Sequence, residues 1–80
     1  MNKMMRTKTY ASTDFYLSAY LKVKGLKLLD VERDGRRAIF IFEDRENRKE
    51  LIKGFYNDGM VQINAFKNAI QDLKAATYNL

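Results

Sequence analysis

The residues best suited to chemistry in this sequence are four carboxylates near its middle, Glu43, Asp44, Glu46 and Glu50. Grouped carboxylates can hold a hard divalent cation. Here, however, basic residues at 45, 48 and 49 interleave with them, and their spacing differs from that of a calcium loop. Carboxylates also gather at helix N-termini, where they meet the positive end of the helix dipole. We therefore expect a helix to start here, and no metal site.

The residue inventory excludes most catalytic chemistries. The 80 residues include no His and no Cys, so the commonest general base, the thiol nucleophile and the usual zinc ligands are missing. The four glycines are scattered along the chain and do not form a phosphate-binding loop. We expect a protein that is not an enzyme and that needs no cofactor.

The net charge of +5 is concentrated in the first part of the sequence. Residues 1–29 hold six basic residues and one acidic residue, whereas residues 30–80 hold equal numbers of each. A basic N-terminal segment and a basic helix end could contact nucleic-acid phosphates, or could only keep a small domain in solution. The candidates for phosphate contact are Lys3, Arg6, Lys8, Lys22, Lys24, Lys27, Arg36 and Arg37.

The centre of the predicted fold is a β-hairpin. Two runs rich in apolar residues, 26–31 and 38–42, flank Asp34-Gly35, a sequence that favours a type I′ turn. With this turn, Val31 lies opposite Ala38, and side chains alternate between two faces. One face then carries the predicted core residues Leu29, Val31, Ala38, Phe40 and Phe42.

The other face of this hairpin carries three aliphatic residues, Leu28, Ile39 and Ile41. Apolar residues on a strand face need cover, which either a helix of this chain or another protein can supply. The three residues are therefore candidates for a protein interface, including a homodimer. The sequence leaves both alternatives open.

Three helices and two short strands complete the prediction. The helices are expected to follow their capping residues: one after Ser12 or Thr13 to about 24, one at 45–57 after Asp44, and one at 65–78 after Asn64. Arg48 is expected on the solvated face of the second helix, and Gly54 inside it indicates close approach of another element. The short strands are expected at 8–11 and at 60–63. The order β-α-β-β-α-(β)-α predicts an α+β fold, with helices packed on a small, mostly antiparallel sheet centred on residues 27–42.

Five short motifs follow one another along the chain: Ser12-Thr13-Asp14, Leu17-x3-Leu21-x3-Gly25, Phe40-Ile41-Phe42-Glu43-Asp44, Phe55-Tyr56-Asn57 and Leu73-Lys74. In this order they resemble a family of short bacterial and phage-associated proteins of unknown function, over residues 8–80. The resemblance implies a shared fold and an origin in bacteria or their mobile elements. The family has no assigned activity, so the resemblance assigns no functional residues.

The order of elements is also similar to that of the RNA-recognition fold, which displays aromatic residues on its third strand for base stacking. Here Arg37 and Ile39 take the stacking positions, whereas Phe40 and Phe42 point to the core. The stacking chemistry of that fold is therefore missing.

Taken together, the residues predict one domain at 8–80, preceded by a disordered basic segment at 1–7. No apolar run approaches the roughly 20 residues that span a bilayer, so we expect a cytoplasmic protein. The expected function is non-catalytic binding, as a protein-interaction or self-associating regulatory module. The alternative is a nucleic-acid-binding accessory protein.

Overall fold

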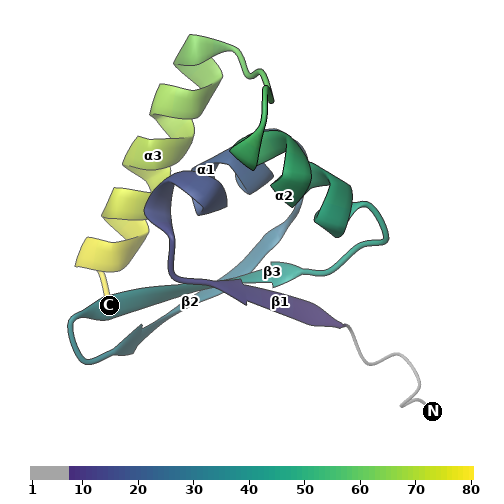
Figure 1. The fold of residues 1–80 in the computed structure, drawn as a ribbon. Coiled ribbons are helices and arrows are strands. Elements are labelled where there is room, and N and C mark those ends of the chain that lie inside the picture. Colours follow the sequence, from purple (N-terminus) through teal and green to yellow (C-terminus); the bar gives the residue numbers. More distant parts are fainter. Residues whose placement is uncertain (1–7) are drawn as a thin grey trace.

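Three helices lie on one side of a three-stranded antiparallel sheet in the computed structural model, which describes residues 8–80 (Figure 1). β3 is the central strand, with β1 and β2 at the edges. The predicted α+β fold is confirmed, although residues 60–63 lead into the last helix and form no strand. The elements in chain order are β1 (Thr9–Ser12), α1 (Phe15–Val23), β2 (Leu28–Asp34), β3 (Arg37–Glu43), α2 (Arg48–Tyr56) and α3 (Ile63–Tyr78).

The hairpin turn lies one residue later than predicted. Asp34 pairs with Arg37, so Gly35 and Arg36 form the loop. Gly35 has a φ of +65°, and no other residue of β2, the turn or β3 has a positive φ. A positive φ at the first loop position alone is the pattern of a type II′ turn. The type I′ prediction is wrong because such a turn needs a positive φ at both loop residues, and of the loop residues Gly35 and Arg36 only Gly35 has one.

A β-bulge in β2 decides which leucine faces the helices. Leu28 lies opposite Phe42 and Asp30 lies opposite Ile41, so Leu29 is the extra residue. Leu28 packs against the core, whereas Leu29 is 42% exposed. The sequence predicted the reverse, with Leu29 in the core and Leu28 on the opposite face. It was wrong because simple alternation does not foresee the extra residue.

The first helix is held at both ends by local hydrogen bonds. Asp14 is its N-cap, since Asp14 Oδ1 accepts a hydrogen bond from Leu17 N at 3.0 Å. The predicted caps, one or two residues earlier, do not take this place. After the helix, Gly25 has a φ of +104°, and Leu26 N donates to Leu21 O at 3.0 Å. Gly25 thus ends α1 and returns Leu26 to the last turn of the helix.

The other two helices begin at different residues than predicted. α2 begins after Asn47 rather than Asp44, and α3 begins after Gln62 rather than Asn64. Asp44 does not cap α2 because its carboxylate binds Arg48 instead. None of the helices in residues 8–80 is long and apolar enough to cross a membrane.

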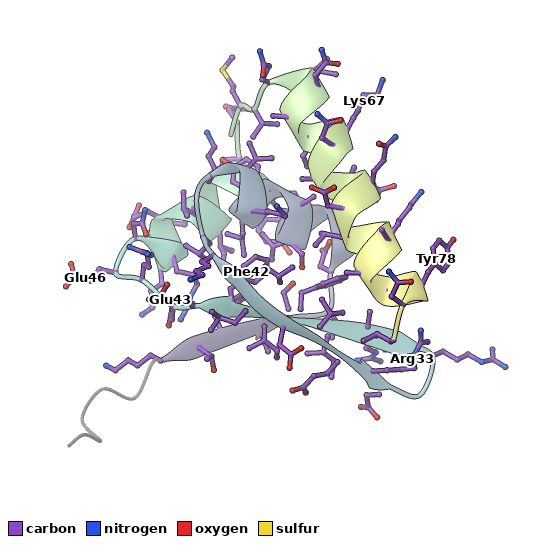
Figure 2. The ribbon with its side chains drawn as sticks, turned by 180° about the vertical axis from the view of Figure 1, so that it is seen from behind. Arg33, Phe42, Glu43, Glu46, Lys67 and Tyr78 are labelled. Carbon is purple, nitrogen blue, oxygen red and sulfur yellow. The ribbon has the colours of Figure 1, made fainter. Side chains whose placement is uncertain are left out.

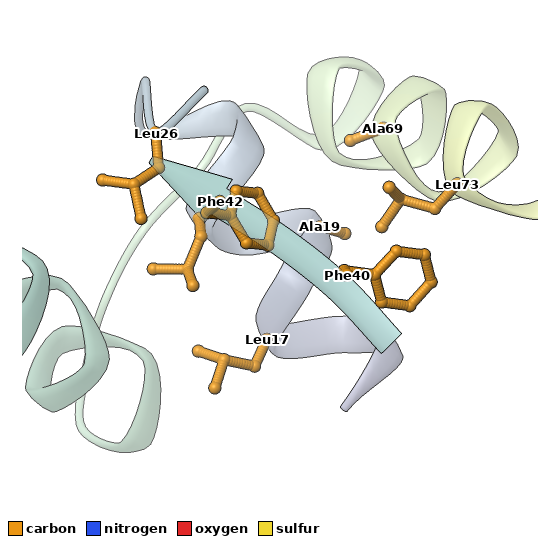
Figure 3. Packing of buried hydrophobic residues seen from close by; sticks show 8 residues of the cluster. Leu17, Ala19, Leu26, Phe40, Phe42, Ala69 and Leu73 are labelled. Atoms are coloured by element: carbon orange, nitrogen blue, oxygen red, sulfur yellow. The ribbon is translucent and has the colours of Figure 1, made fainter. Parts of the chain in front are cut away.

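The core lies between β3 and the helices. Phe40 and Phe42 are fully buried and project from β3 toward α1 and α3 (Figure 3). Val31 and Ala38 also pack against this cluster, so four of the five predicted core residues of the hairpin are confirmed. The helices contribute Leu17, Ala19, Leu21, Ala69 and Leu73, and the segment before β2 contributes Leu26.

Gly54 lies where α1 and α2 meet. A Cβ at this position would lie 2.9 Å from Tyr20 Oη, so the predicted close approach is confirmed. The same hydroxyl lies against Gly59, where a Cβ would also meet Gly54 O at 2.5 Å. Tyr20 is buried, and its ring lies 5.4 Å from that of Phe55. The two glycines thus make room for one buried tyrosine.

Candidate interaction surfaces

The sheet face that points away from the helices is open. All three helices lie on the opposite side, and no segment of residues 8–80 covers this face (Figures 1 and 2). Ile39 and Ile41 point to it because their neighbours Phe40 and Phe42 point into the core. Ala11 of β1 lies opposite Ile41 and is exposed. We call this surface, formed by the outward residues of all three strands, the open face.

Carboxylates surround the two isoleucines on the open face. The cross-strand neighbours of Ile41 and Ile39 on β2 are Asp30 and Glu32. Alternation also places Asp34, Arg37 and Glu43 on this face. Four carboxylates therefore share this face with one guanidinium, and one of the four, Glu43, also pairs with Arg45 at 3.4 Å; the chain as a whole has a net charge of +5. The open face is a small aliphatic centre in an acidic surround.

The three predicted interface residues do not lie together. Ile39 and Ile41 are half-buried neighbours on the open face. Leu28 instead faces the helices beside Phe42, because of the bulge. Leu29, which the sequence assigned to the core, is the exposed leucine. The bulge thus exchanges the two leucines between core and surface.

The predicted phosphate-binding residues are divided between two ends of the sheet. Lys8 and Lys27 lie on either side of the end of β3, because their carbonyls accept hydrogen bonds from Asp44 N and Glu43 N. Two strand spacings separate their backbones, about 9.5 Å. Between them lie two residues with carboxylates, Glu43, which ends β3, and Asp44, which follows it. Arg36 and Arg37 lie at the hairpin turn, at the other end of seven-residue strands.

The remaining basic candidates have their own contacts or lie elsewhere. Lys22 Nζ lies 3.8 Å from Asp72 Oδ2, and Lys24 Nζ lies 5.4 Å from the centre of the Tyr20 ring. Lys3 and Arg6 lie outside the residues that the structure describes. The six basic candidates that the structure describes therefore do not form one continuous surface.

A polar cluster joins β1 to the start of α2. Arg48 Nε and Nη2 donate to Asp44 Oδ1 and Oδ2 at 3.1 and 3.2 Å, and the guanidinium lies 4.4 Å from the centre of the Tyr10 ring. Hydrogen bonds from Arg48 lower the pKa of the Asp44 carboxyl and raise that of the guanidinium. Arg48 was predicted to lie on the solvated face of the second helix, and this prediction is wrong. The side chain instead anchors α2 to the sheet.

A hollow of about 290 Å³ beside this cluster is lined by Lys8, Asp44, Arg45 and Glu46. Its two cationic and two anionic side chains do not favour a ligand of either charge. Among residues 8–80 no three His, Asp or Glu side chains lie close enough to hold a metal ion. Of the central carboxylates, Glu43 and Asp44 pair with Arg45 and Arg48, and Glu50 lies 3.8 Å from Lys53 Nζ.

A second exposed surface was not predicted from the sequence. Tyr16 of α1 and Phe66 of α3 stack with ring centroids 6.4 Å apart. Ile63 lies one turn before Phe66 on α3 and is 73% exposed, Met60 precedes the helix and is 81% exposed, and Tyr16 is 61% exposed. We call the apolar residues Tyr16, Ile63 and Phe66 of these two helices the α1–α3 patch. Its signal in the sequence is the run 59–66, which has no charged residue.

A family model for DUF5659, described as a domain of unknown function, matches residues 7–79. The chain belongs to this family. The match spans both surfaces of this DUF5659 domain and all six of its helices and strands. Neither the comparison with curated proteins nor the comparison with solved structures gives a match. The resemblance seen in the sequence is thus confirmed at the level of a family of unknown function.

Proposed function

We propose that this DUF5659 domain is a non-catalytic protein-interaction module, and that its open face binds a basic partner protein. The observation that carries the proposal is the uncovered sheet face with Ile39 and Ile41 at its centre. Aliphatic side chains on an uncovered sheet face are typical of a binding surface. A regulatory role and a bacterial or phage origin, which the family resemblance suggests, are part of the same proposal.

Charge complementarity selects the partner. Four carboxylates around two isoleucines fit a surface on which Lys or Arg side chains flank a few aliphatic residues. A second copy of this chain fits less well, because two open faces in contact would bring together the Asp30, Glu32 and Asp34 carboxylates of both copies. Nucleic acid is repelled by the same carboxylates. The partner is therefore a different protein with a basic, amphipathic segment.

The proposal is tested with two synthetic peptides of equal length and opposite charge. One is an amphipathic helix of Leu and Lys, and the other replaces each Lys by Glu. Each is titrated into isotope-labelled protein while the backbone amide resonances are followed. We expect the Lys peptide to shift the resonances of residues 37–43 and 9–12, and the Glu peptide to leave them unchanged. The overall charge of +5 repels the Lys peptide, so binding of this peptide would show that the carboxylates of the open face attract it.

Two matched double variants provide the control. Asp30→Lys with Glu32→Lys reverses charge on the open face, whereas Glu46→Lys with Asp58→Lys makes the same change in net charge elsewhere. We expect only the first pair to abolish binding of the Lys peptide. Equal shifts with both peptides, or shifts confined to the α1–α3 patch, would overturn the proposal.

Nucleic-acid binding is the alternative, and Lys8 and Lys27 on either side of the end of β3 are the observation in its favour. An electrophoretic shift with mixed DNA and RNA at about 50 mM salt tests it, since phosphate contacts are strongest at low salt. A shift that is lost in Lys8→Ala with Lys27→Ala would replace the protein-binding proposal by this one. No shift would remove the alternative.

A further inference from the structure

The turn that follows α2 begins with an asparagine whose backbone differs from that of the others. Asn57, the residue after α2, has a φ of −112° and a ψ of −117°. Two other asparagines at helix ends, Asn47 and Asn79, have ψ values of 3° and 8°. Asn64 and Asn68 lie within α3. Among the asparagines that the structure describes, Asn57 is thus set apart by its ψ.

This ψ brings the side chain of Asn57 and the next backbone nitrogen to the same side of the Cα–C bond. Seen along this bond, the N and Cβ substituents of an L-residue are about 120° apart, so a ψ of about −120° makes the next nitrogen eclipse the Cβ. At −117°, Asp58 N is therefore almost in line with Asn57 Cβ. Both atoms belong to the ring of the cyclic imide (succinimide) that an asparagine forms with the following nitrogen. Every atom of that ring except Cγ is already in its plane, and rotation about χ1 brings Cγ to the nitrogen.

The nitrogen that would attack is not engaged in a hydrogen bond. Asn57 N donates to Lys53 O at 3.1 Å, and Gly59 N donates to Gly54 O at 2.7 Å. Asp58 N, between them, donates to no acceptor in the part of the chain that the structure describes. Asn57 and Asp58 are both exposed, so water reaches them. Asn57 Nδ2 donates to Lys53 O at 2.7 Å, and this hydrogen bond must be released before Cγ can turn toward the nitrogen.

We propose that Asn57 is a site of spontaneous deamidation, with water as the reactant and ammonia as the product. Asp58 N attacks Asn57 Cγ, its proton passes through solvent to the departing amide nitrogen, and the Cγ–Nδ2 bond breaks to release ammonia. Water then opens the cyclic imide at one of its two carbonyls. Opening at the main-chain carbonyl leaves isoaspartate, in which the main chain runs through the side chain, and opening at Cγ leaves aspartate.

Either product weakens the end of α2. A carboxylate does not donate, so the hydrogen bond from Asn57 Nδ2 to Lys53 O is lost. The new negative charge lies at the C-terminus of α2, where the helix dipole disfavours it. Isoaspartate also adds a methylene to the main chain just before Gly59, whose N–H closes the turn onto Gly54 O. Because both glycines lie against Tyr20 Oη, deamidation loosens the turn that holds α2 beside α1.

The test is peptide mass spectrometry of the full chain after incubation at neutral pH, with an unincubated sample as the blank. Trypsin releases residues 54–67, which contain both Asn57 and Asn64. Deamidation raises the mass because OH replaces NH2, whereas isomerisation of Asp58 leaves it unchanged, and fragmentation assigns the site. We expect Asn57 to be modified first among the asparagines that the structure describes.

A synthetic peptide of residues 54–67 separates the effect of the fold from that of the sequence. Asn57 should be modified at least as fast in the folded chain as in the peptide, because the fold already holds the reactive ψ. Asn64, held in α3, should be modified more slowly in the folded chain. If folding slows Asn57 as it slows Asn64, or if another asparagine is modified first, the proposal is overturned.

Asn57→Asp mimics one product and tests its effect on α2. It should lower the midpoint of urea unfolding relative to the parent. Asn64→Asp makes the same change in net charge in the first turn of α3, where a carboxylate is favourable, and should not lower the midpoint. An equal midpoint in Asn57→Asp and the parent would contradict the loosening of α2. These measurements do not involve the open face, so this proposal and the proposed function can fail separately.

Discussion

The contact between Gly54 and Tyr20 determines how replacing Gly54 by Ala should change the stability of the protein. Whether the substitution stabilises or destabilises the fold depends on one oxygen atom, Tyr20 Oη. Gly54 lies within α2, where Ala would stabilise a helix by about 1 kcal/mol relative to Gly. In this protein a Cβ at Gly54 would lie 2.9 Å from Tyr20 Oη and 3.9 Å from Tyr20 Cζ. The first distance requires the buried ring to move, whereas the second is an ordinary van der Waals contact. The hydroxyl therefore opposes the substitution.

The magnitudes follow from these distances. An added methyl group in a packed site costs about 1–3 kcal/mol. Set against the gain in helix propensity, Gly54→Ala should lower the free energy of unfolding by up to about 2 kcal/mol. In a Tyr20→Phe background the hydroxyl is absent, so the same substitution should raise the free energy of unfolding by up to about 1 kcal/mol. The coupling between the two sites is then about 1–3 kcal/mol.

The assay is urea unfolding of the parent, Gly54→Ala, Tyr20→Phe and the double variant, followed by circular dichroism. The free energies of unfolding are compared with the same dependence on urea concentration for all four proteins. Gly59→Ala is the control, because its Cβ would also meet the backbone oxygen of Gly54 at 2.5 Å. Removing the Tyr20 hydroxyl should leave Gly59→Ala still destabilised. If Gly54→Ala has the same effect with and without the hydroxyl, then the close approach is not the reason for glycine in α2.

Three further predictions concern the sheet and the core. The pKa of Asp44 is lowered by hydrogen bonds from Arg48, so the stability that this pair adds is present above about pH 4, and is lost as the pH falls further. When unfolding is measured at decreasing pH, Asp44→Asn should therefore lose less stability than the parent. An equal loss in both proteins would contradict this role of Asp44. Leu73→Ala should cost about 2–5 kcal/mol in chemical unfolding because Leu73 is fully buried, whereas the exposed Leu80→Ala should change little. Gly35→Ala should cost about 1–3 kcal/mol, since Gly35 has a φ of +65°, and a neutral result in the same assay would contradict the turn geometry.

The sequence predicted the fold where a pattern had only one physical solution. Alternation of apolar side chains placed Phe40 and Phe42 in the core correctly, because strand residues two apart share a face. Alternation failed at Leu28 and Leu29, because both residues are apolar and a bulge can turn either one inward. The place of a bulge depends on how the whole sheet twists, which a local pattern does not specify.

The helix starts and the surfaces were harder to predict for a related reason. Asp44 can cap a helix or pair with Arg48, and the structure uses the second arrangement because Tyr10 also lies beside the guanidinium. α1 is apolar nearly all round, so its pattern does not indicate that Tyr16 is exposed while Tyr20 is buried. These outcomes depend on contacts between residues far apart in sequence. The open face was the exception, since Ile39 and Ile41 were identified from alternation alone.

The bulged edge strand β2 has a consequence for how the protein behaves when it is concentrated. Asp30 Oδ1 accepts a hydrogen bond from Val31 N at 2.8 Å, so this backbone donor is already engaged. Acidic residues recur along the strand at Asp30, Glu32 and Asp34. A bulge and charged side chains on an edge strand hinder the addition of another strand. Addition of another strand at the β2 edge should thus be hindered even at millimolar concentration, so of the two sheet edges the uncharged strand β1 is the one left open to it.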